Sequence, residues 1–237
     1  WKTSGHPVVS VRESEDPGSV IVSQSKFQFL PAGDKDIWPV PLHIRYKLAG
    51  SGEVIEEKVL FNEKETTLNL GKGHDTIEWV VLNAGGSGFY RVDYSDALRN
   101  KLLVDVQNTL EIIERFNLVN DSWASVRARS EGSMTTTEYL ELVKSFATET
   151  DANVWSVLSG ALRTVYGLTS GAHRLAFKQS IREIVRPVFD KLGWTPKEGE
   201  SVHTLQLRGS LAGLLGTVGS DKEIRTEAAK QFDAWKA

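Results

Sequence analysis

Gly85-Gly86-Ser87-Gly88-Phe89-Tyr90-Arg91-Val92-Asp93-Tyr94-Ser95 separates two halves of the chain that differ in periodicity. Its three glycines favour a sharp turn with positive φ. The residues that follow alternate in type, which predicts a strand with aromatic side chains on both faces. Ser95-Asp96 then predicts a helix N-cap, and the apolar spacing lengthens from two to between three and four residues. We therefore expect two structural layers to meet here.

The residues before this stretch predict short strands separated by turns. With the strand of the stretch itself, alternating or β-branched runs fall at residues 8–11, 20–30, 38–46, 54–61, 66–70, 76–82 and 89–95. Gly and Pro signals such as Gly50-Ser51-Gly52 separate them. This pattern predicts an antiparallel β-sandwich of immunoglobulin-like or fibronectin-like architecture. The absence of cysteine argues against a true immunoglobulin domain.

The residues after the stretch predict helices. A first helix of about twenty residues would carry one apolar stripe: Leu98, Leu102, Val106, Leu110 and Ile113. Asn120-Asp121 predicts the cap of a second helix, and later starts are predicted at Thr135, Thr150-Asp151, Gly171, Ser201 and Ser220.

Seven helices joined by short loops favour stacked pairs, as in an α-solenoid of the ARM or HEAT kind. We thus predict a sandwich domain over residues 1–95 and a helical domain over residues 96–237. We expect the helical domain to be truncated.

Three motifs resemble the zinc aminopeptidases of the aminopeptidase N family. The start, Trp1 to Val11 with Gly5 and Pro7, is similar to the opening of that family's third domain. The Tyr90-Arg91-Val92 strand is similar to the end of that domain, and the segment from Leu118 to Ser125 resembles an early turn of the fourth. The resemblance implies the β-sandwich third domain and the first part of the helical fourth domain of a zinc metallopeptidase.

The composition limits the kinds of partner that the chain can bind and indicates its cellular compartment. The net charge of −3 provides no electrostatic footprint for nucleic acid or anionic lipid. No apolar run approaches the ~20 residues that cross a bilayer. The chain has no cysteine, which favours a reducing compartment, and we expect a cytoplasmic protein.

The sequence holds no pattern for catalytic zinc. Zinc peptidases of this type place two histidines one helical turn apart, with a glutamate between them. None of the five histidines has a second histidine four residues away. The pair His74 and Glu78 lies in a turn entering a strand, so we do not expect it to bind metal. We predict no catalytic, cofactor-binding or metal-binding residue in these 237 residues.

Two readings of Tyr90 and Arg91 stay open. In the first, Tyr90 is a buried strand aromatic, and Arg91 pairs with Asp93 or with a carboxylate across the sheet. In the second, the two residues fix the angle between the sandwich and the first helix. Packing is the favoured reading. The glycines at 85, 86 and 88 resemble a phosphate-binding loop only in composition, because they lead into a strand.

We therefore expect a non-catalytic portion of a zinc aminopeptidase that removes N-terminal residues from peptides. In the family, such a portion is a spacer and lid over the catalytic domain. Its partners would be the catalytic domain of the same parent chain, which would hold the zinc, and peptides. The alternative is a free-standing sandwich-plus-solenoid module that binds proteins. Ala228, Ala229, Phe232 and Trp235 predict an open apolar face on the last helix, and self-association through it.

Overall fold

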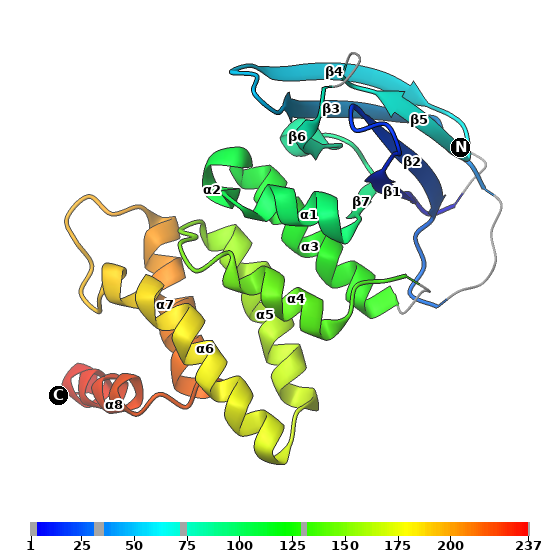
Figure 1. Cartoon of the computed structure of the whole chain (residues 1–237). Coiled ribbons are helices and arrows are strands. Elements are labelled where there is room, and N and C mark those ends of the chain that lie inside the picture. The colour runs from blue at the N-terminus through cyan, green and yellow to red at the C-terminus, as the bar shows by residue number, and fades with distance from the viewer. Residues whose placement is uncertain (1–3, 31–35, 72–74, 129–131, 237) are drawn as a thin grey trace. The chain divides into compact units, whose positions relative to one another are not determined.

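The computed structural model describes residues 4–30, 36–71, 75–128 and 132–236 (Figure 1). Its strands are β1 (Pro7–Glu13), β2 (Ser19–Lys26), β3 (Val40–Leu48), β4 (Val54–Phe61), β5 (Glu65–Asn69), β6 (Ile77–Val81) and β7 (Arg91–Tyr94). Its helices are α1 (Asp96–Leu103), α2 (Val106–Thr109), α3 (Ile112–Ala128), α4 (Thr136–Lys144), α5 (Ala152–Leu168), α6 (Gly171–Leu192), α7 (Val202–Thr217) and α8 (Lys222–Lys236), and a short 3-10 turn, η1 (Ala84–Gly86), precedes β7. The predicted fold class, a β-sandwich followed by helices, is confirmed.

Two sheets form the sandwich. One has the strand order β5-β2-β1-β7 and the other β4-β3-β6. All neighbouring strands are antiparallel except β1 and β7, which run parallel with Val9 opposite Val92. This parallel pairing joins the start of the described chain to the strand that leads into the helices.

Alternating side chains of both sheets fill the sandwich core. Residues such as Val9, Val22, Ile44 and Val80 are completely buried between the sheets. Burying a side chain of this size contributes about 1.5–3 kcal/mol. Alternation is the pattern that a half-exposed antiparallel sheet requires, and it is what the sequence shows.

The first predicted helix is wrong in its length. The stretch from Asp96 to Ile113 forms α1, then α2, and only then the start of α3. The Arg45 guanidinium donates to the Thr109 carbonyl oxygen at 2.9 Å, which satisfies that group at the end of α2. Leu110 is extended, with φ −110° and ψ 136°, so the helix cannot continue directly into α3.

Asn120 and Asp121 do not cap a helix. They lie inside α3, which runs without interruption from Ile112 to Ala128. Asp121 is tolerated there because its carboxylate accepts hydrogen bonds from β7 instead of from its own backbone. The strand before the first helix is also shorter than predicted, since β7 starts at Arg91 and Phe89 is 86% exposed.

The other predicted helix starts can each be compared with the cap that the structure has there. Thr135 and Glu138 exchange hydrogen bonds as the predicted capping box, and Asp151 and Ser201 cap α5 and α7. The predicted cap at Ser220 is wrong. Asp221 accepts the Ile224 N–H at 3.1 Å instead, because Ser220 turns with φ +51°.

The chain divides into two compact units, residues 1–139 and 140–237. The helices α1, α2 and α3 therefore belong to the same unit as the two sheets. The boundary predicted at residue 95 marks the change of secondary structure, and as a domain boundary it stays a prediction.

In the second unit, α7 packs against both α5 and α6. Leu207, Leu211, Leu214 and Leu215 of α7 are buried there, so no open face remains on that side of the helix. In contrast, Ile224 is the only residue of α8 that is buried. Its residues Phe232 and Trp235 are 52% and 80% exposed, which confirms the open apolar face predicted on the last helix.

Candidate functional site

The stretch from residue 82 to residue 94 meets α3 within the first unit, and this joint is the candidate site. At its base, two tyrosines bind both backbone groups of Leu82. The Tyr90 hydroxyl donates to the Leu82 carbonyl oxygen at 2.6 Å, and the Leu82 N–H donates to the Tyr94 hydroxyl at 3.1 Å. Side chains thus satisfy both backbone groups just beyond the buried end of β6.

The glycine turn is held closed by Asn83. Its amide oxygen accepts the Gly88 N–H at 2.9 Å, and its amide nitrogen donates to the Gly88 carbonyl oxygen at 3.2 Å. A Cβ on Gly86 would lie 2.5 Å from Ile113 Cγ1, and a Cβ on Gly88 would lie 2.1 Å from the Tyr90 ring. Both glycines are therefore required by close packing, and the phosphate-loop reading has no support in this geometry.

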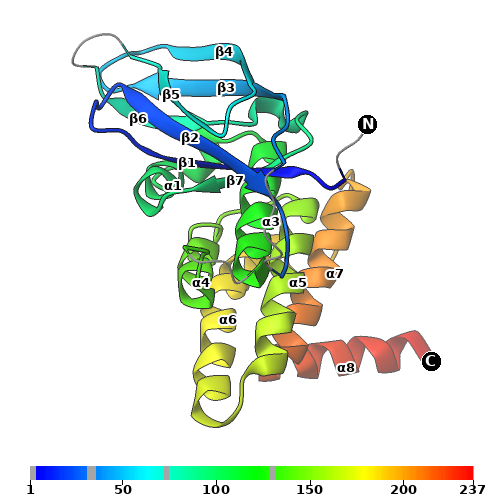
Figure 2. The same ribbon diagram turned by 90° about the vertical axis from the view of Figure 1, so that its right-hand side faces the viewer.

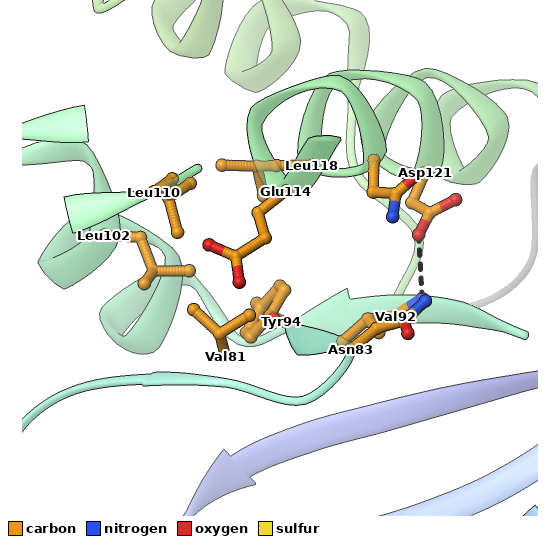
Figure 3. A pocket seen from close by; sticks show the side chains of 10 residues that line it. Val81, Asn83, Val92, Tyr94, Leu102, Leu110, Glu114, Leu118 and Asp121 are labelled. Carbon is orange, nitrogen blue, oxygen red and sulfur yellow. Dashed lines mark hydrogen bonds between the residues drawn. The ribbon is translucent and has the colours of Figure 1, made fainter. Parts of the chain in front are cut away.

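Glu114 of α3 is the central acceptor of the joint. Its buried carboxylate accepts from both Arg45 of β3 and the backbone N–H groups of Gly85 and Glu111. Arg45 also lies over the Trp79 ring, 5.1 Å from its centroid. One carboxylate thus ties together the three-stranded sheet, the glycine turn and the start of α3. Figure 3 shows it pointing between Tyr94, Val81 and Leu110, into a cavity of about 20 Å³.

Asp121, two turns further along α3, holds the edge of β7. It accepts from the Arg91 guanidinium at 2.7 Å. It also accepts from the Val92 N–H at 3.0 Å, as Figure 3 shows. Because β7 is the last strand of its sheet, the Val92 N–H has no strand partner on this side. Arg91 therefore pairs with a carboxylate on a helix, rather than with Asp93 or a residue across the sheet as the sequence suggested.

Burial governs the charge of this carboxylate. It raises the pKa of Asp121 to about 6, against the lowering effects of the Val92 N–H and the Arg91 guanidinium. Burial also raises the pKa of Asp93, while Arg99 and the Ser125 hydroxyl act in the opposite direction. The carboxyl groups of Asp93 and Asp121, whose pKa values are both raised by burial, thus lie close together beneath the joint.

Two hollows adjoin Asp93. One, of about 150 Å³, lies between β1, β2, β7 and α3 and is lined by Arg91 and Asp121. The other, of about 440 Å³, is bordered by Arg99 and Glu138. Arg99 is already paired with Asp96 at 2.5 Å, and Glu138 is bound to Thr135. Arg99 and Glu138, which border the larger hollow, thus both have partners, as in a structural joint.

The geometry of the joint can now be compared with known proteins. A family model described as the ERAP1-like C-terminal domain matches residues 79–237, which include β7, the glycine turn and all eight helices. The match covers more than half of the chain. The chain belongs to this family.

The ERAP1-like C-terminal domain has curated relatives, of which two of the three described below are named aminopeptidases. Aminopeptidase M1 of Arabidopsis thaliana is 30% identical over 252 residues, which span 100% of this chain and 28% of the relative. Puromycin-sensitive aminopeptidase of Caenorhabditis elegans is 25% identical, over 93% of this chain and 23% of the relative. Tricorn protease-interacting factor F2 of Thermoplasma volcanium is 27% identical, over 98% of this chain and 26% of the relative. The chain spans about a quarter of the length of these relatives. It is a C-terminal region of the M1 aminopeptidase family.

Within the described ranges, no three His, Asp or Glu side chains form a group that could hold a metal ion. His74, of the pair not expected to bind metal, lies outside the described residues, and Glu78 pairs with Lys47 at 3.0 Å. No helix in the described part of the chain is long and apolar enough to span a membrane.

The sequence predictions named Tyr90 and Arg91 but missed Asp121 as the partner of Arg91 and Glu114 as the partner of Arg45. A signal was present: Leu110, Glu114, Leu118 and Asp121 follow one another at spacings of four, four and three residues. Two acids therefore share the buried face of α3 with Leu118. A carboxylate on an apolar stripe requires a buried donor, and this rule would have pointed to the joint.

Proposed function

We propose that this chain is the non-catalytic C-terminal portion of a longer zinc aminopeptidase, where it acts as a spacer and lid over the catalytic domain. The observation that supports this most is the alignment of the whole chain with Aminopeptidase M1, of which it covers only 28%. An enzyme that devotes about a quarter of its length to such a region has its chemistry elsewhere. The proposal includes a cytoplasmic location.

The catalytic partner would supply the metal. Zinc lowers the pKa of a bound water and polarises a peptide carbonyl, and both effects need protein ligands in a fixed geometry. We propose that the zinc ligands lie in the catalytic domain of the same parent chain, which also binds the peptide. The 237 residues described here would then contribute shape and positioning.

The joint is suited to such a role. A lid must hold its orientation against the domain it covers, and packed elements with buried ion pairs resist bending better than a flexible linker. The Arg45–Glu114 and Arg91–Asp121 pairs connect both sheets to α3 within one unit. We propose that this fixes the sandwich to the first helices as a single rigid piece of the spacer.

A split-protein experiment tests the proposal. The remainder of the parent protein and the 237-residue chain would be expressed separately and mixed. We expect the remainder to hydrolyse a short aminoacyl anilide and also to attack the N-terminus of a folded protein. Addition of the chain should leave the rate of anilide hydrolysis unchanged and should suppress attack on the folded protein. If the chain neither binds the remainder nor alters this size dependence, the free-standing binding module is the better account.

A further inference from the structure

The outer strand of the three-stranded sheet has one free edge. β4 pairs with β3, and no other strand of the described chain lies on its far side (Figures 1 and 2). A free edge presents a row of unpaired N–H and C=O groups that can pair with another strand. At eight residues, β4 is long for such an edge.

The outward face of β4 carries a self-complementary row. Val54, Glu56, Lys58 and Leu60 are all exposed, and Val54 and Leu60 are 50% and 63% accessible. Charged residues on an edge normally prevent pairing, because they meet unfavourable partners. Here the row reads apolar, acid, base, apolar, so a second copy running in the opposite direction presents the matching order.

A two-fold axis perpendicular to the sheet makes this match specific. Such an axis keeps each face on its own side, so even-numbered residues must lie opposite even-numbered residues. With the axis at Glu57, Val54 lies opposite Leu60 and Glu56 lies opposite Lys58, each pair occurring twice. Directly opposed residues of unlike charge or of apolar type stabilise an antiparallel pair.

The inward face fits the same register. Ile55 lies opposite Val59, and only Glu57 meets its own copy at the axis. The Glu57 carboxylate accepts the Tyr46 hydroxyl at 2.8 Å, which draws it toward β3 and away from the free edge. The like-charge contact at the axis is therefore reduced.

Neighbouring registers are worse. Moving the axis by one residue toward the C-terminus places Lys58 opposite Lys58 and Glu56 opposite Leu60. Moving it by one residue the other way places Glu56 opposite Glu56 and Val54 opposite Lys58. Both shifts replace two attractive charge pairs by a repulsive one, so a single register is selected.

We propose that β4 pairs antiparallel with β4 of a second copy of this chain, forming one continuous sheet with three strands from each copy. The contact is short and partly charged, so the dimer should be weak and transient, with a dissociation constant of about 1 μM or higher. Main-chain hydrogen bonds supply the attraction, and the row of Val54, Glu56, Lys58 and Leu60 sets the register.

Charge reversal with rescue tests the pairing. Sedimentation of the 237-residue chain would be measured at low ionic strength from about 1 μM to about 1 mM. Lys58→Glu places Glu56 opposite an acid in both pairs and should weaken the dimer about tenfold or more. The double variant Glu56→Lys/Lys58→Glu restores opposite charges and should return the constant to within about threefold of the original.

Lys64→Glu is the matched control, because it makes the same charge change on an exposed residue outside β4 and should leave the constant unchanged. Trp235→Glu separates this contact from the apolar face of α8. A chain that stays monomeric at every concentration would overturn the proposal. So would a dimer that Trp235→Glu abolishes and Lys58→Glu leaves intact, or a double variant that fails to recover.

Discussion

Tyr90 and Tyr94 bind the two backbone polar groups of a single residue, Leu82, which is itself completely buried. The first tyrosine donates to the carbonyl oxygen and the second accepts from the N–H. Tyr90 lies just before β7 and Tyr94 is the last residue of β7, and their even spacing of four positions places both hydroxyls on the same side, because side chains in an extended chain alternate. This relationship anchors the end of β6 to the strand that leads into the helices.

Removal of either hydroxyl should destabilise the first unit. Tyr94→Phe leaves the Leu82 N–H without its acceptor, and Tyr90→Phe leaves the carbonyl oxygen without its donor. We expect each variant to lose about 1–3 kcal/mol in the free energy of unfolding, measured by urea titration.

Tyr166→Phe is the control for these two variants. Its hydroxyl makes no hydrogen bond among the residues that the structure describes, so a loss below about 0.5 kcal/mol is expected. Equal losses for all three variants would show that the hydroxyls do not act through Leu82.

For the stability of the fold, the hydrogen bond that Asp121 accepts should matter more than its negative charge. Asp121→Ala removes the acceptor of the Val92 N–H and the carboxylate that pairs with the Arg91 guanidinium. We expect a loss of about 2–4 kcal/mol in unfolding free energy, lower than for a fully buried pair because Arg91 is 23% exposed.

Asp121→Asn keeps an oxygen for the Val92 N–H and should lose less. The exposed pair of Glu141 and Lys144 provides the comparison, since Glu141→Ala should change the unfolding free energy by less than about 0.5 kcal/mol. A loss for Asp121→Asn as large as that for Asp121→Ala would contradict this order.

The same carboxyl should make stability fall as pH rises. Its pKa is 3.8 ordinarily and about 6 in the folded chain, so the folded state binds the proton more tightly between these values. The contribution of this group to unfolding free energy should therefore decrease by about 2–3 kcal/mol between pH 4 and pH 7.

Asp93 titrates in the same direction, so the comparison must isolate Asp121. Urea midpoints of the natural chain and of Asp121→Asn at several pH values give the difference directly. The loss caused by Asp121→Asn should be largest near pH 4 and shrink toward pH 7. A loss that grows with pH would mean that pairing with Arg91 outweighs burial.

Alanine substitutions at Gly86 and Gly50 separate the effect of backbone strain from the effect of close packing. Both adopt positive φ, +65° and +76°, so alanine at either position costs about 1–2 kcal/mol. Only at Gly86 would the new Cβ meet other atoms, at 2.5 Å from Ile113 and 3.0 Å from Asn117. We expect Gly86→Ala to lose about 1–3 kcal/mol more than Gly50→Ala in thermal or urea unfolding. Equal losses would mean that α3 gives way to the added methyl group.

Periodicity and caps were enough to predict the two-layer architecture. Alternation sets the faces of each strand, and Ser95, Asp151 and Ser201 start helices where the sequence indicates, because these effects act within a few residues. The joint could not be predicted in the same way. Arg45 and Glu114 are far apart in sequence, and the same distant Arg45 also binds the Thr109 carbonyl oxygen at the end of α2. Long-range ion pairs of this kind override local helix preference.

The zinc content and the aminoacyl-anilide hydrolysis of two samples test the central claim most directly. One sample is the 237-residue chain and the other is the product of the complete reading frame, both washed with chelator and then resupplied with zinc. The account predicts about one bound zinc and turnover in the longer protein, and neither in the 237-residue chain, which lacks the paired histidines that hold such a metal. Stoichiometric zinc together with turnover in the 237-residue chain alone would contradict it.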